Sequence, residues 1–314
     1  MADFVPLEPA PRLVELTIDG VPVRAPEGST LLQACQQVGA DIPTLCYGPT
    51  LHPVNACRVC MVEVEGSRVL VPSCSRRVEP GMVVRTDSDR VRHSRKMVLE
   101  FLDSSVDFST TPKVPEWRER YGVNRDRYGP PAPAAAPGER DRLEAGHHHP
   151  VEPGTRATVA QPTKIDNELY IRAYGKCILC YKCVEACGKD AQNTFALTVA
   201  GRGFDARIST EFAVELPDSA CVYCGNCIAV CPTGALMFKS EHDRREAGTW
   251  DEAAQTVTRT VCPYCGVGCN LELHVQDNEI VKVTSPLDHD ITAGNLCIKG
   301  RFGWRYVQNR APAP

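Results

Sequence analysis

The sequence has little of the positive charge that nucleic-acid binding requires, and it contains no long apolar run. Its 35 Lys and Arg residues are outnumbered by 39 Asp and Glu residues, giving a formal net charge of −4. A basic surface for phosphate backbones is therefore not expected. No apolar stretch approaches the roughly 18–20 residues that span a bilayer, and residues 1–12 lack the basic and apolar regions of a secretory signal. We therefore predict a cytoplasmic protein with neither nucleic-acid nor membrane partners.

Cysteine is the residue type that the chain does have in excess. The 314 residues are 43% hydrophobic and 24% charged, which is enough apolar material for two or three folded domains and excludes a disordered or collagen-like chain. The 17 cysteines occur without a secretory signal, so a disulfide framework is not the default interpretation. Ligation of metals or of iron–sulfur clusters is the leading hypothesis.

A proline-rich stretch divides the chain into two halves. Residues 129–162 contain seven prolines and almost no large apolar residue, which is the composition of a semi-extended linker. The stretch also includes His147, His148 and His149. We interpret these histidines as part of a solvated tract rather than as a metal site. A domain boundary is therefore expected here.

Local sequence signals predict elements on both sides of this linker. Near the start, two strands should flank the turn Asp19-Gly20, and a helix should follow that begins at Ser29 or Thr30 and ends at Gly39. Cys35 falls on the apolar face of that helix, where an unliganded cysteine commonly serves as a core residue. Helical spacing predicts a second helix over residues 88–102, and alternation predicts a hairpin over residues 271–284.

The spacing C-x2-C-x2-C-x3-C occurs twice after the linker and predicts two 4Fe-4S clusters. In this pattern three cysteines of one run hold one cluster, and the fourth cysteine reaches the other cluster. A pair of zinc sites is the alternative, but zinc typically takes its ligands from separated C-x2-C pairs. The first predicted cluster is bound by Cys177, Cys180, Cys183 and Cys231, and the second by Cys187, Cys221, Cys224 and Cys227.

A different spacing groups the cysteines near the start of the chain. Cys46, Cys57, Cys60 and Cys74 form C-x10-C-x2-C-x13-C, and a strand is expected over residues 61–64, directly after the central pair. The spacing favours a 2Fe-2S cluster but leaves a zinc site open.

The sequence around these four cysteines resembles that of a known domain. TLLQACQQVGADIPTLC and NACRVCMVEVEG resemble the N-terminal 2Fe-2S domain of three protein groups. These are the large iron–sulfur subunit of respiratory NADH dehydrogenase, iron-only hydrogenases and NAD-dependent formate dehydrogenases. The resemblance implies a β-grasp fold and a 2Fe-2S cluster.

The last cysteines, Cys262, Cys265, Cys269 and Cys297, lie within CPYCGVGC and CIKGR. These motifs resemble the 4Fe-4S module that opens the catalytic subunit of molybdenum or tungsten enzymes with a bis-pterin guanine dinucleotide cofactor. The residues of these motifs resemble those of formate dehydrogenases more closely than those of respiratory NADH dehydrogenase. The resemblance implies a fourth cluster, with Lys299 between cluster and pterin as an electron-transfer mediator. A solvated loop lysine is the alternative for Lys299.

Two features of the resembled proteins are missing from the sequence. Their additional cluster uses a pattern like H-P-x-D-C-x2-C-x5-C, whereas this chain has residues 104–108 there, with Thr111 and Trp117 at the later cysteine positions. We expect no cluster at this place and interpret His93 as an exposed helix residue. The chain also ends in Ala-Pro-Ala-Pro where the resembled enzymes continue into pterin-binding domains. We expect that a gene split has placed the catalytic body on another chain, and a truncated sequence is the alternative.

These observations predict an α+β protein. Its expected parts are a β-grasp 2Fe-2S domain (11–87), a helical remnant without cluster ligands (88–128), the linker (129–162), a bacterial-type double 4Fe-4S ferredoxin domain (163–245) and a small β-rich 4Fe-4S module of the bis-pterin oxidoreductase type (255–310).

The resemblance implies an electron-transfer subunit of an NAD-dependent formate dehydrogenase, with no complete active site on this chain. The implied partners are a separate molybdenum or tungsten bis-pterin subunit and a subunit that binds FMN and NAD, with a small 2Fe-2S subunit as a further candidate. Another bis-pterin oxidoreductase, an NADH dehydrogenase-like complex and a free-standing ferredoxin-like carrier are the alternatives.

Overall fold

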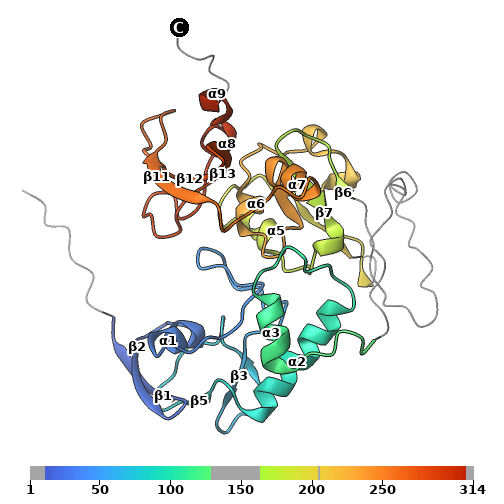
Figure 1. The fold of residues 1–314 in the computed structure, drawn as a ribbon. Coiled ribbons are helices and arrows are strands. Elements are labelled where there is room, and N and C mark those ends of the chain that lie inside the picture. The colour runs from blue at the N-terminus through green and yellow to red at the C-terminus, as the bar shows by residue number, and fades with distance from the viewer. Residues whose placement is uncertain (1–10, 129–162, 204–205, 309–314) are drawn as a thin grey trace, which may run out of the picture. The chain divides into compact units, whose positions relative to one another are not determined.

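A computed structural model of the protein describes residues 11–128, 163–203 and 206–308 (Figure 1). The predicted linker with its three histidines, and the Ala-Pro-Ala-Pro end, lie outside the described residues. The described chain forms two compact units. The first comprises residues 11–45, 57–99 and 116–123, and the second comprises all other described residues.

The first unit is built on a five-stranded sheet in the order β2-β1-β5-β3-β4. β1 pairs antiparallel with β2 and parallel with β5, while β3 is antiparallel to both of its neighbours. The hairpin turn at Asp19 (φ 48°) and Gly20 (φ 83°) has the left-handed backbone that was expected there. The strands are β1 (Leu13–Ile18), β2 (Val21–Pro26), β3 (Met61–Val64), β4 (Val71–Pro72) and β5 (Val83–Arg85).

Helix α1 (Leu31–Gln37) completes this mixed sheet and helix arrangement. The sequence left Ser29 and Thr30 open as the cap, and the structure shows Thr30, whose hydroxyl accepts the Gln33 amide in a capping box. The chain leaves the helix at Gly39 with φ 71°, as predicted. Two further helices follow, α2 (Asp89–Asp103) and α3 (Val114–Tyr121). The predicted second helix is thus confirmed.

The second unit contains a two-fold repeat of loop and helix that carries the cysteine runs. Helices α5 (Lys182–Cys187) and α6 (Asn226–Val230) pack against each other. A three-stranded sheet in the order β10-β7-β6 and a pair of strands, β8 and β9, surround them. The strands are β6 (Thr163–Lys164), β7 (Tyr170–Ala173), β8 (Thr198–Ala200), β9 (Arg207–Ser209) and β10 (Leu236–Phe238), with α7 (Lys239–Glu246) after β10 and the short 3-10 helices η1 (Tyr174–Lys176), η3 (Glu211–Ala213) and η4 (Leu216–Asp218) between them.

A third sheet in the same unit has the order β11-β12-β13. The predicted hairpin is confirmed, because β12 (Asn270–Gln276) and β13 (Glu279–Thr284) are joined by Asp277 and Asn278 with φ values of 53° and 62°. β11 (Thr256–Val261) forms one edge of this sheet, and all six of its residues are exposed. The short helices α8 (Ile298–Phe302) and α9 (Arg305–Gln308) follow.

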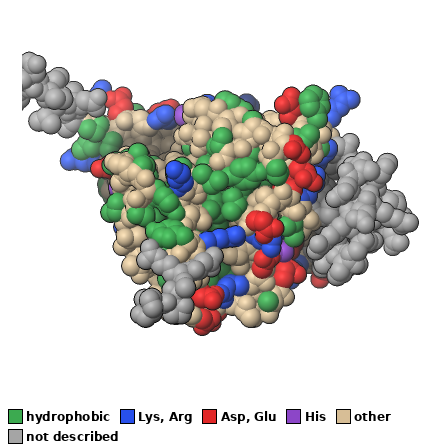
Figure 2. Space-filling model, turned by 90° about the horizontal axis from the view of Figure 1, so that it is seen from above, with side chains coloured by type: hydrophobic (Ala, Val, Ile, Leu, Met, Phe, Trp, Pro, Cys, Tyr) green, Lys and Arg blue, Asp and Glu red, His purple; other side chains and the backbone are tan. Residues whose placement is uncertain are grey.

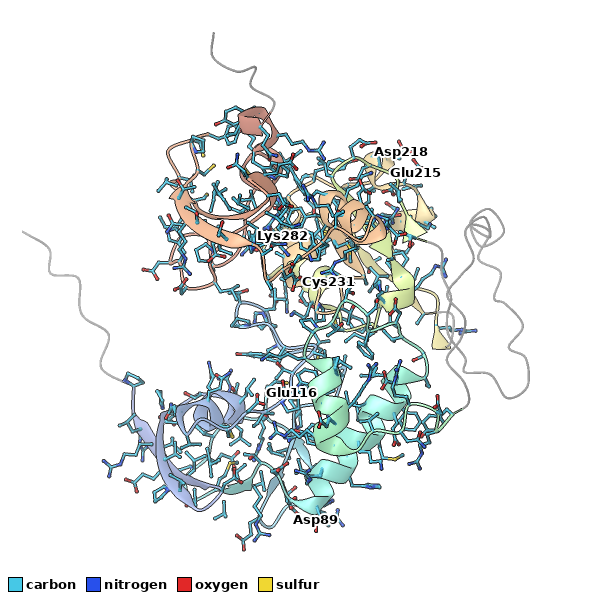
Figure 3. All side chains as sticks on the ribbon, viewed as in Figure 1. Asp89, Glu116, Glu215, Asp218, Cys231 and Lys282 are labelled. Carbon is cyan, nitrogen blue, oxygen red and sulfur yellow. The ribbon has the colours of Figure 1, made fainter. Side chains whose placement is uncertain are left out.

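This C-terminal sheet is tied to the ferredoxin-like part of its own unit. The ammonium of Lys282 on β13 donates to Glu241 on α7 at 3.1 Å (Figure 3), and the ring of Phe302 stacks on Tyr170 with centroids 6.1 Å apart. Phe302 therefore belongs to the same apolar core as the cysteine-bearing helices. Over the described ranges, no helix is both long enough and apolar enough to cross a membrane. The α+β class predicted from the sequence is confirmed.

Candidate iron–sulfur sites

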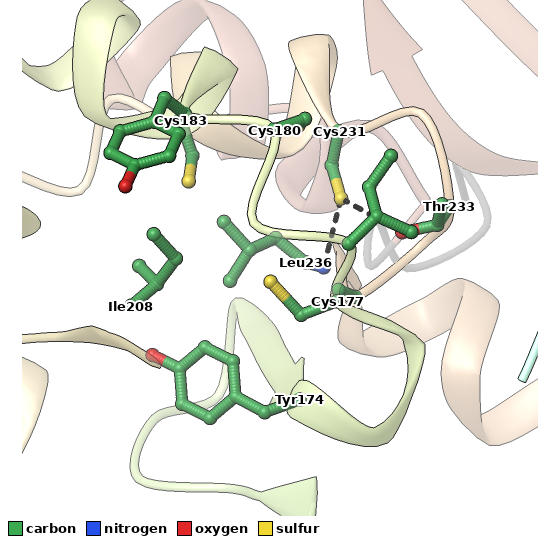
Figure 4. Close-up of a pocket in the computed structure, with 11 residues that line it drawn as sticks. Tyr174, Cys177, Cys180, Cys183, Ile208, Cys231, Thr233 and Leu236 are labelled. Carbon is green, nitrogen blue, oxygen red and sulfur yellow. Dashed lines mark hydrogen bonds between the residues drawn. The ribbon is translucent and has the colours of Figure 1, made fainter. Parts of the chain in front are cut away.

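The first predicted ferredoxin set surrounds one cavity of the second unit (Figure 4). The cavity has about 350 Å³ of empty space, part of it open to solvent. Its other walls are mainly apolar and include Tyr174, Ile208 and Leu236. Three of the lining thiols come from the loop and first turn of α5, and the fourth comes from the residue that follows α6: Cys177, Cys180, Cys183 and Cys231.

The second set lines a separate cavity with about 300 Å³ of empty space, part of it open to solvent. The Tyr170 hydroxyl lies 3.0 Å from the sulfur of Cys221, and the Thr194 hydroxyl lies 3.4 Å from the sulfur of Cys187. The structure thus brings together the crossed sets that the spacing predicted, with three thiols from one run and one from the other. The thiols of this cavity are Cys187, Cys221, Cys224 and Cys227.

The two cysteine loops have the same backbone conformation, which directs amide groups toward the sulfur atoms. Leu179 and Tyr223 occupy matching places in the two loops, and both have left-handed backbone, with φ values of 50° and 55°. Their amides donate to Cys177 and Cys221 respectively, in both cases at 3.4 Å. Hydrogen bonds to ligand sulfur are one of the ways in which a protein adjusts the potential of a cluster.

Burial raises the pKa of several thiols that line the two cavities. The pKa of Cys177 rises to about 11 and that of Cys180 to about 12, mainly because both lie out of water. Burial raises the pKa of Cys183 and Cys227 well above the usual range of thiols. Since the thiolate is the form that binds metal, the positive charge of a bound cluster's iron would favour the ionised form that burial disfavours. Four sulfur donors around each of two largely apolar cavities fit two 4Fe-4S clusters.

The four C-terminal cysteines differ from the ferredoxin sets in their exposure. Cys262 is buried, whereas Cys265 and Cys297 are exposed. The Cys262 amide donates to the carbonyl of Cys269 at 2.8 Å. Burial raises the pKa of Cys269, and so do the nearby thiols of the other three cysteines, so all four lie within electrostatic reach of one another. Lys299 is exposed on α8. This set fits a cluster at the surface of the described chain.

The predicted 2Fe-2S ligands belong to both units, and each part is described by itself. In the first unit, Cys57, Cys60 and Cys74 are buried beside β3 and β4. The Ser73 hydroxyl donates to the carbonyl of Cys60 at 2.8 Å, which joins the neighbour of Cys74 to the Cys60 turn. Cys46 is also buried and lies in the 46–56 segment of the second unit.

The stretch that aligns with the missing cluster is folded. Phe108 and Thr111 are buried in the second unit, and Trp117 is buried in the first. The hydroxyl of Thr110 donates to the carbonyl of Thr233 at 2.6 Å. His93 is exposed on α2, as the sequence predicted. Within the described residues, no three His, Cys, Asp or Glu side chains are arranged to hold a single metal ion.

Sequence reasoning missed several residues that contact these sites. Tyr170 and Tyr174 each line one ferredoxin cavity, and the fully buried Arg301 contacts the second cysteine loop. The sequence contains a signal for Arg301 only, as the last residue of CIKGR, and it gives no indication that its side chain would be buried.

Comparison with known families agrees with this geometry. Residues 11–89 match the 2Fe-2S iron–sulfur cluster binding domain, residues 176–235 match the 4Fe-4S dicluster domain, and residues 255–309 match the molybdopterin oxidoreductase Fe4S4 domain. The chain is an iron–sulfur protein. The three matches include all seventeen cysteines. Sixteen of them form the predicted cluster sets, and the seventeenth, Cys35, is buried in the α1 core.

Curated relatives align with most of the chain. A component of the NADH-quinone oxidoreductase of Rhizobium meliloti (strain 1021) is 33% identical over 95% of this chain and 32% of its own length. NADP-reducing hydrogenase subunit HndD of Solidesulfovibrio fructosivorans is 37% identical over 74% of this chain and 36% of its own length. A putative formate dehydrogenase, SH0748 of Staphylococcus haemolyticus (strain JCSC1435), is 24% identical over 94% of this chain and 31% of its own length. The chain therefore spans about a third of the length of these relatives.

A solved structure also shares the fold. A chain of the NAD+-reducing [NiFe]-hydrogenase, solved in the H2-reduced state, superposes with a TM-score of 0.56 at 24% identity, covering 72% of this chain and 87% of that chain. The iron–sulfur assignment itself rests on the family matches and the cysteine geometry.

Proposed function

We propose that this chain is the electron-transfer subunit of a cytoplasmic NAD-dependent formate dehydrogenase complex. In the proposed complex it relays electrons between a molybdenum or tungsten bis-pterin site on another chain, where formate is oxidised or carbon dioxide reduced, and a subunit that binds FMN and NAD. A small 2Fe-2S subunit is a further candidate partner. The clusters supply one-electron transfer, and this chain supplies no acid, base or nucleophile to the reaction.

One arrangement carries the proposal: the two ferredoxin cavities are connected to the surface cysteine set within one unit. Asn226 lies between two ligands of the second cavity, and its side-chain oxygen accepts the amide of Leu296 at 3.0 Å. Leu296 directly precedes Cys297 of the surface set. The three 4Fe-4S ligand sets are thus held together by packed, hydrogen-bonded residues, as a relay requires.

The surface around the last set supports a docked partner chain. Cys265, Cys297 and Lys299 are exposed there, and Figure 2 shows hydrophobic side chains gathered on the face seen from above. Contiguous apolar surface near a functional site is typical of an interaction site. In the proposal this surface faces the bis-pterin subunit, with Lys299 as mediator. Exposed apolar residues of this region include Val257, Val261, Tyr264, Val267, Leu287, Ile291 and Ile298.

The CPYCGVGC motif and the putative formate dehydrogenase among the relatives support formate as the substrate of the proposed complex. Other relatives are named as subunits of an NADH-quinone oxidoreductase and of an NADP-reducing hydrogenase. The second candidate is therefore a subunit of an NADH dehydrogenase-like or other bis-pterin complex, and the third is a free-standing carrier.

The decisive experiment is anaerobic purification of the native complex, with metal analysis and assays of formate, nitrate and quinone turnover. We expect co-purified molybdenum or tungsten, formate-dependent NAD reduction, and about fourteen iron atoms on this chain, from one 2Fe-2S and three 4Fe-4S clusters. Nitrate or quinone activity in place of formate activity would support the second candidate, and an iron-loaded monomer without partners the third. Recovery of the chain in the soluble fraction of lysed cells tests the location.

The exposed Cys265 provides a variant that tests the proposed position of its cluster next to the pterin. Cys265→Ser is expected to remove one 4Fe-4S signal and to reduce formate-driven NAD reduction strongly. Oxidation of NADH by artificial acceptors should be largely retained, because it uses the flavin subunit alone. Equal loss of both activities would contradict the proposed position of this cluster next to the pterin.

A further inference from the structure

Arg301 on α8 is a buried cation between two cluster-binding loops. Its side chain is fully buried, with 0% exposure. Its Nε donates to the carbonyl of Cys224 at 2.9 Å, and an Nη atom donates to the side-chain oxygen of Asn226 at 3.0 Å. The same end of the guanidinium reaches the carbonyl of Gly294 at 3.3 Å, three residues before Cys297. Arg301 thus connects the second ferredoxin loop to the C-terminal set.

Every acceptor of Arg301 is electrically neutral. The acceptors are three backbone carbonyls, including that of Val283 at 3.5 Å, and one side-chain amide. Among the described residues, no carboxylate forms an ion pair with this guanidinium. An uncompensated charge in a protein interior is strongly unfavourable, and guanidinium does not give up its proton in proteins. The negative groups within electrostatic reach are the thiols Cys224, Cys227 and Cys297 when ionised.

The packing holds the guanidinium against the cysteine loop. A Cβ atom on Gly225 would lie 2.3 Å from Cδ of Arg301 and 3.0 Å from the ring of Phe302. Gly225 also has a φ of 69°, which glycine adopts readily. The loop residue between Cys224 and Asn226 therefore has no side chain at the place where Arg301 lies, and the charge is fixed beside the ligand loop.

We propose that Arg301 is the built-in counter-charge of the second ferredoxin cluster and that it raises the reduction potential of that cluster. Reduction adds one electron to the cluster, and a fixed cation in a buried environment favours the more negative state. The C-terminal cluster is shifted in the same direction but less, because the guanidinium reaches its loop only at the carbonyl of Gly294, whereas the link from Arg301 to Cys297 is made by the uncharged backbone amide. The cluster of the Cys177 loop should shift least of the three 4Fe-4S clusters, because no hydrogen bond of the Arg301 side chain reaches that loop. This role rests on the cysteine assignments of the proposed function.

The test is a redox titration of the whole chain, followed by electron paramagnetic resonance, for wild type, Arg301→Gln and Arg301→Lys. Removing the charge in Arg301→Gln should lower the potential of one 4Fe-4S signal by at least about 59 mV, which is a tenfold change in the ratio of reduced to oxidised cluster. Arg301→Lys keeps the charge and should stay close to wild type. The signal concerned is identified by its loss in Cys224→Ser.

Arg259→Gln is the matched control. Arg259 lies in the same C-terminal sheet, but its side chain is 60% exposed and pairs with Glu272, so solvent screens its charge. No cluster potential should move in this variant.

Three outcomes would overturn the role of Arg301. These are unchanged potentials in Arg301→Gln, an equal shift in Arg301→Lys and Arg301→Gln, or a shift of the same size in Arg259→Gln. If Arg301→Gln fails to load the cluster, iron content decides: retention in Arg301→Lys with loss of about four iron atoms in Arg301→Gln supports the counter-charge, and equal loss in both contradicts it. A wild-type chain without three 4Fe-4S signals would instead contradict the cysteine assignments.

Discussion

Asp190 holds His52 by two hydrogen bonds, although the two residues are 138 positions apart in the sequence. The carboxylate accepts the backbone amide of His52 at 2.8 Å and lies 2.6 Å from its Nδ1. The Asp190 side chain is 3% exposed and follows Cys187 by three residues, whereas the His52 ring is 74% exposed. The 46–56 segment, which carries Cys46, is therefore fixed on the ferredoxin-like part of its unit.

Asp190→Ala should release this segment. The His52 amide and ring lose a buried acceptor, and a hydrogen bond to a charged group contributes about 1.5–3 kcal/mol. Hydrogen exchange measured by mass spectrometry should show faster exchange for the amides of residues 48–55, with little change in α1.

His52→Ala is the control for this pair. It removes an exposed ring but keeps the backbone amide that Asp190 accepts, so the increase in exchange should be smaller than in Asp190→Ala. Wild-type exchange in Asp190→Ala would show that the contact does not hold the segment.

Iron content tests the crossed ligand sets. Cys180→Ser should lower the iron content by about four atoms per chain, through loss of one 4Fe-4S cluster. Cys231→Ser should weaken the same paramagnetic signal, since both thiols line the first cavity. Cys35→Ala is the matched control, because this buried thiol lies in the α1 core, and it should keep the full iron content. The paramagnetic signal that Cys227→Ser loses belongs to the second cluster. If Cys231→Ser lost that signal instead, the crossed assignment would be contradicted.

Cys35 should make the first unit less stable at high pH. Burial, with a smaller effect from Asp19, raises its pKa from 9.0 to about 12, while Arg95 opposes the shift. The unfolded chain therefore loses this proton near pH 9, and the folded chain keeps it until about pH 12. The contribution of the protonated Cys35 thiol to the free energy of unfolding is complete below pH 9. It falls by about 1.4 kcal/mol per pH unit as the pH rises from 9 to 12.

Denaturant unfolding of wild type and Cys35→Ala between pH 8 and 11 measures this effect. Groups common to both proteins cancel, so the wild-type curve should fall more steeply. Parallel curves would show that the Cys35 thiol ionises equally well in the folded state.

Thr30, and not Ser29, should contribute to the stability of α1. Thr30→Ala removes the hydroxyl that accepts the Gln33 amide at 3.3 Å and should cost about 1 kcal/mol of unfolding free energy. Ser29→Ala should stay within about 0.5 kcal/mol of wild type. Denaturant unfolding followed by far-ultraviolet circular dichroism measures both variants. A larger effect at Ser29 would contradict the capping geometry.

Much of the local structure could be predicted because short-range chemistry determines it. The turns at Asp19-Gly20 and Asp277-Asn278 need residues that tolerate left-handed backbone, and both sequences supply them. The crossed cysteine sets followed from spacing, because three thiols in one short loop can surround only one face of a cluster.

Contacts between distant segments could not be predicted in the same way. Two of the acceptors of Arg301 lie on Cys224 and Asn226, at least 75 residues earlier, and nothing in CIKGR distinguishes a buried arginine from an exposed one. β6 and β4 have two residues each, too few for a periodic signal, so their pairing depends on the strands beside them.

Strand β11 has a consequence for handling the protein. As an edge strand, β11 exposes backbone hydrogen-bonding groups and the side chains of Val257 and Val261 to water. An exposed edge strand is a template for pairing with a further strand. The isolated protein should therefore aggregate as its concentration rises, and co-expression with a chain that covers this edge strand should prevent the aggregation.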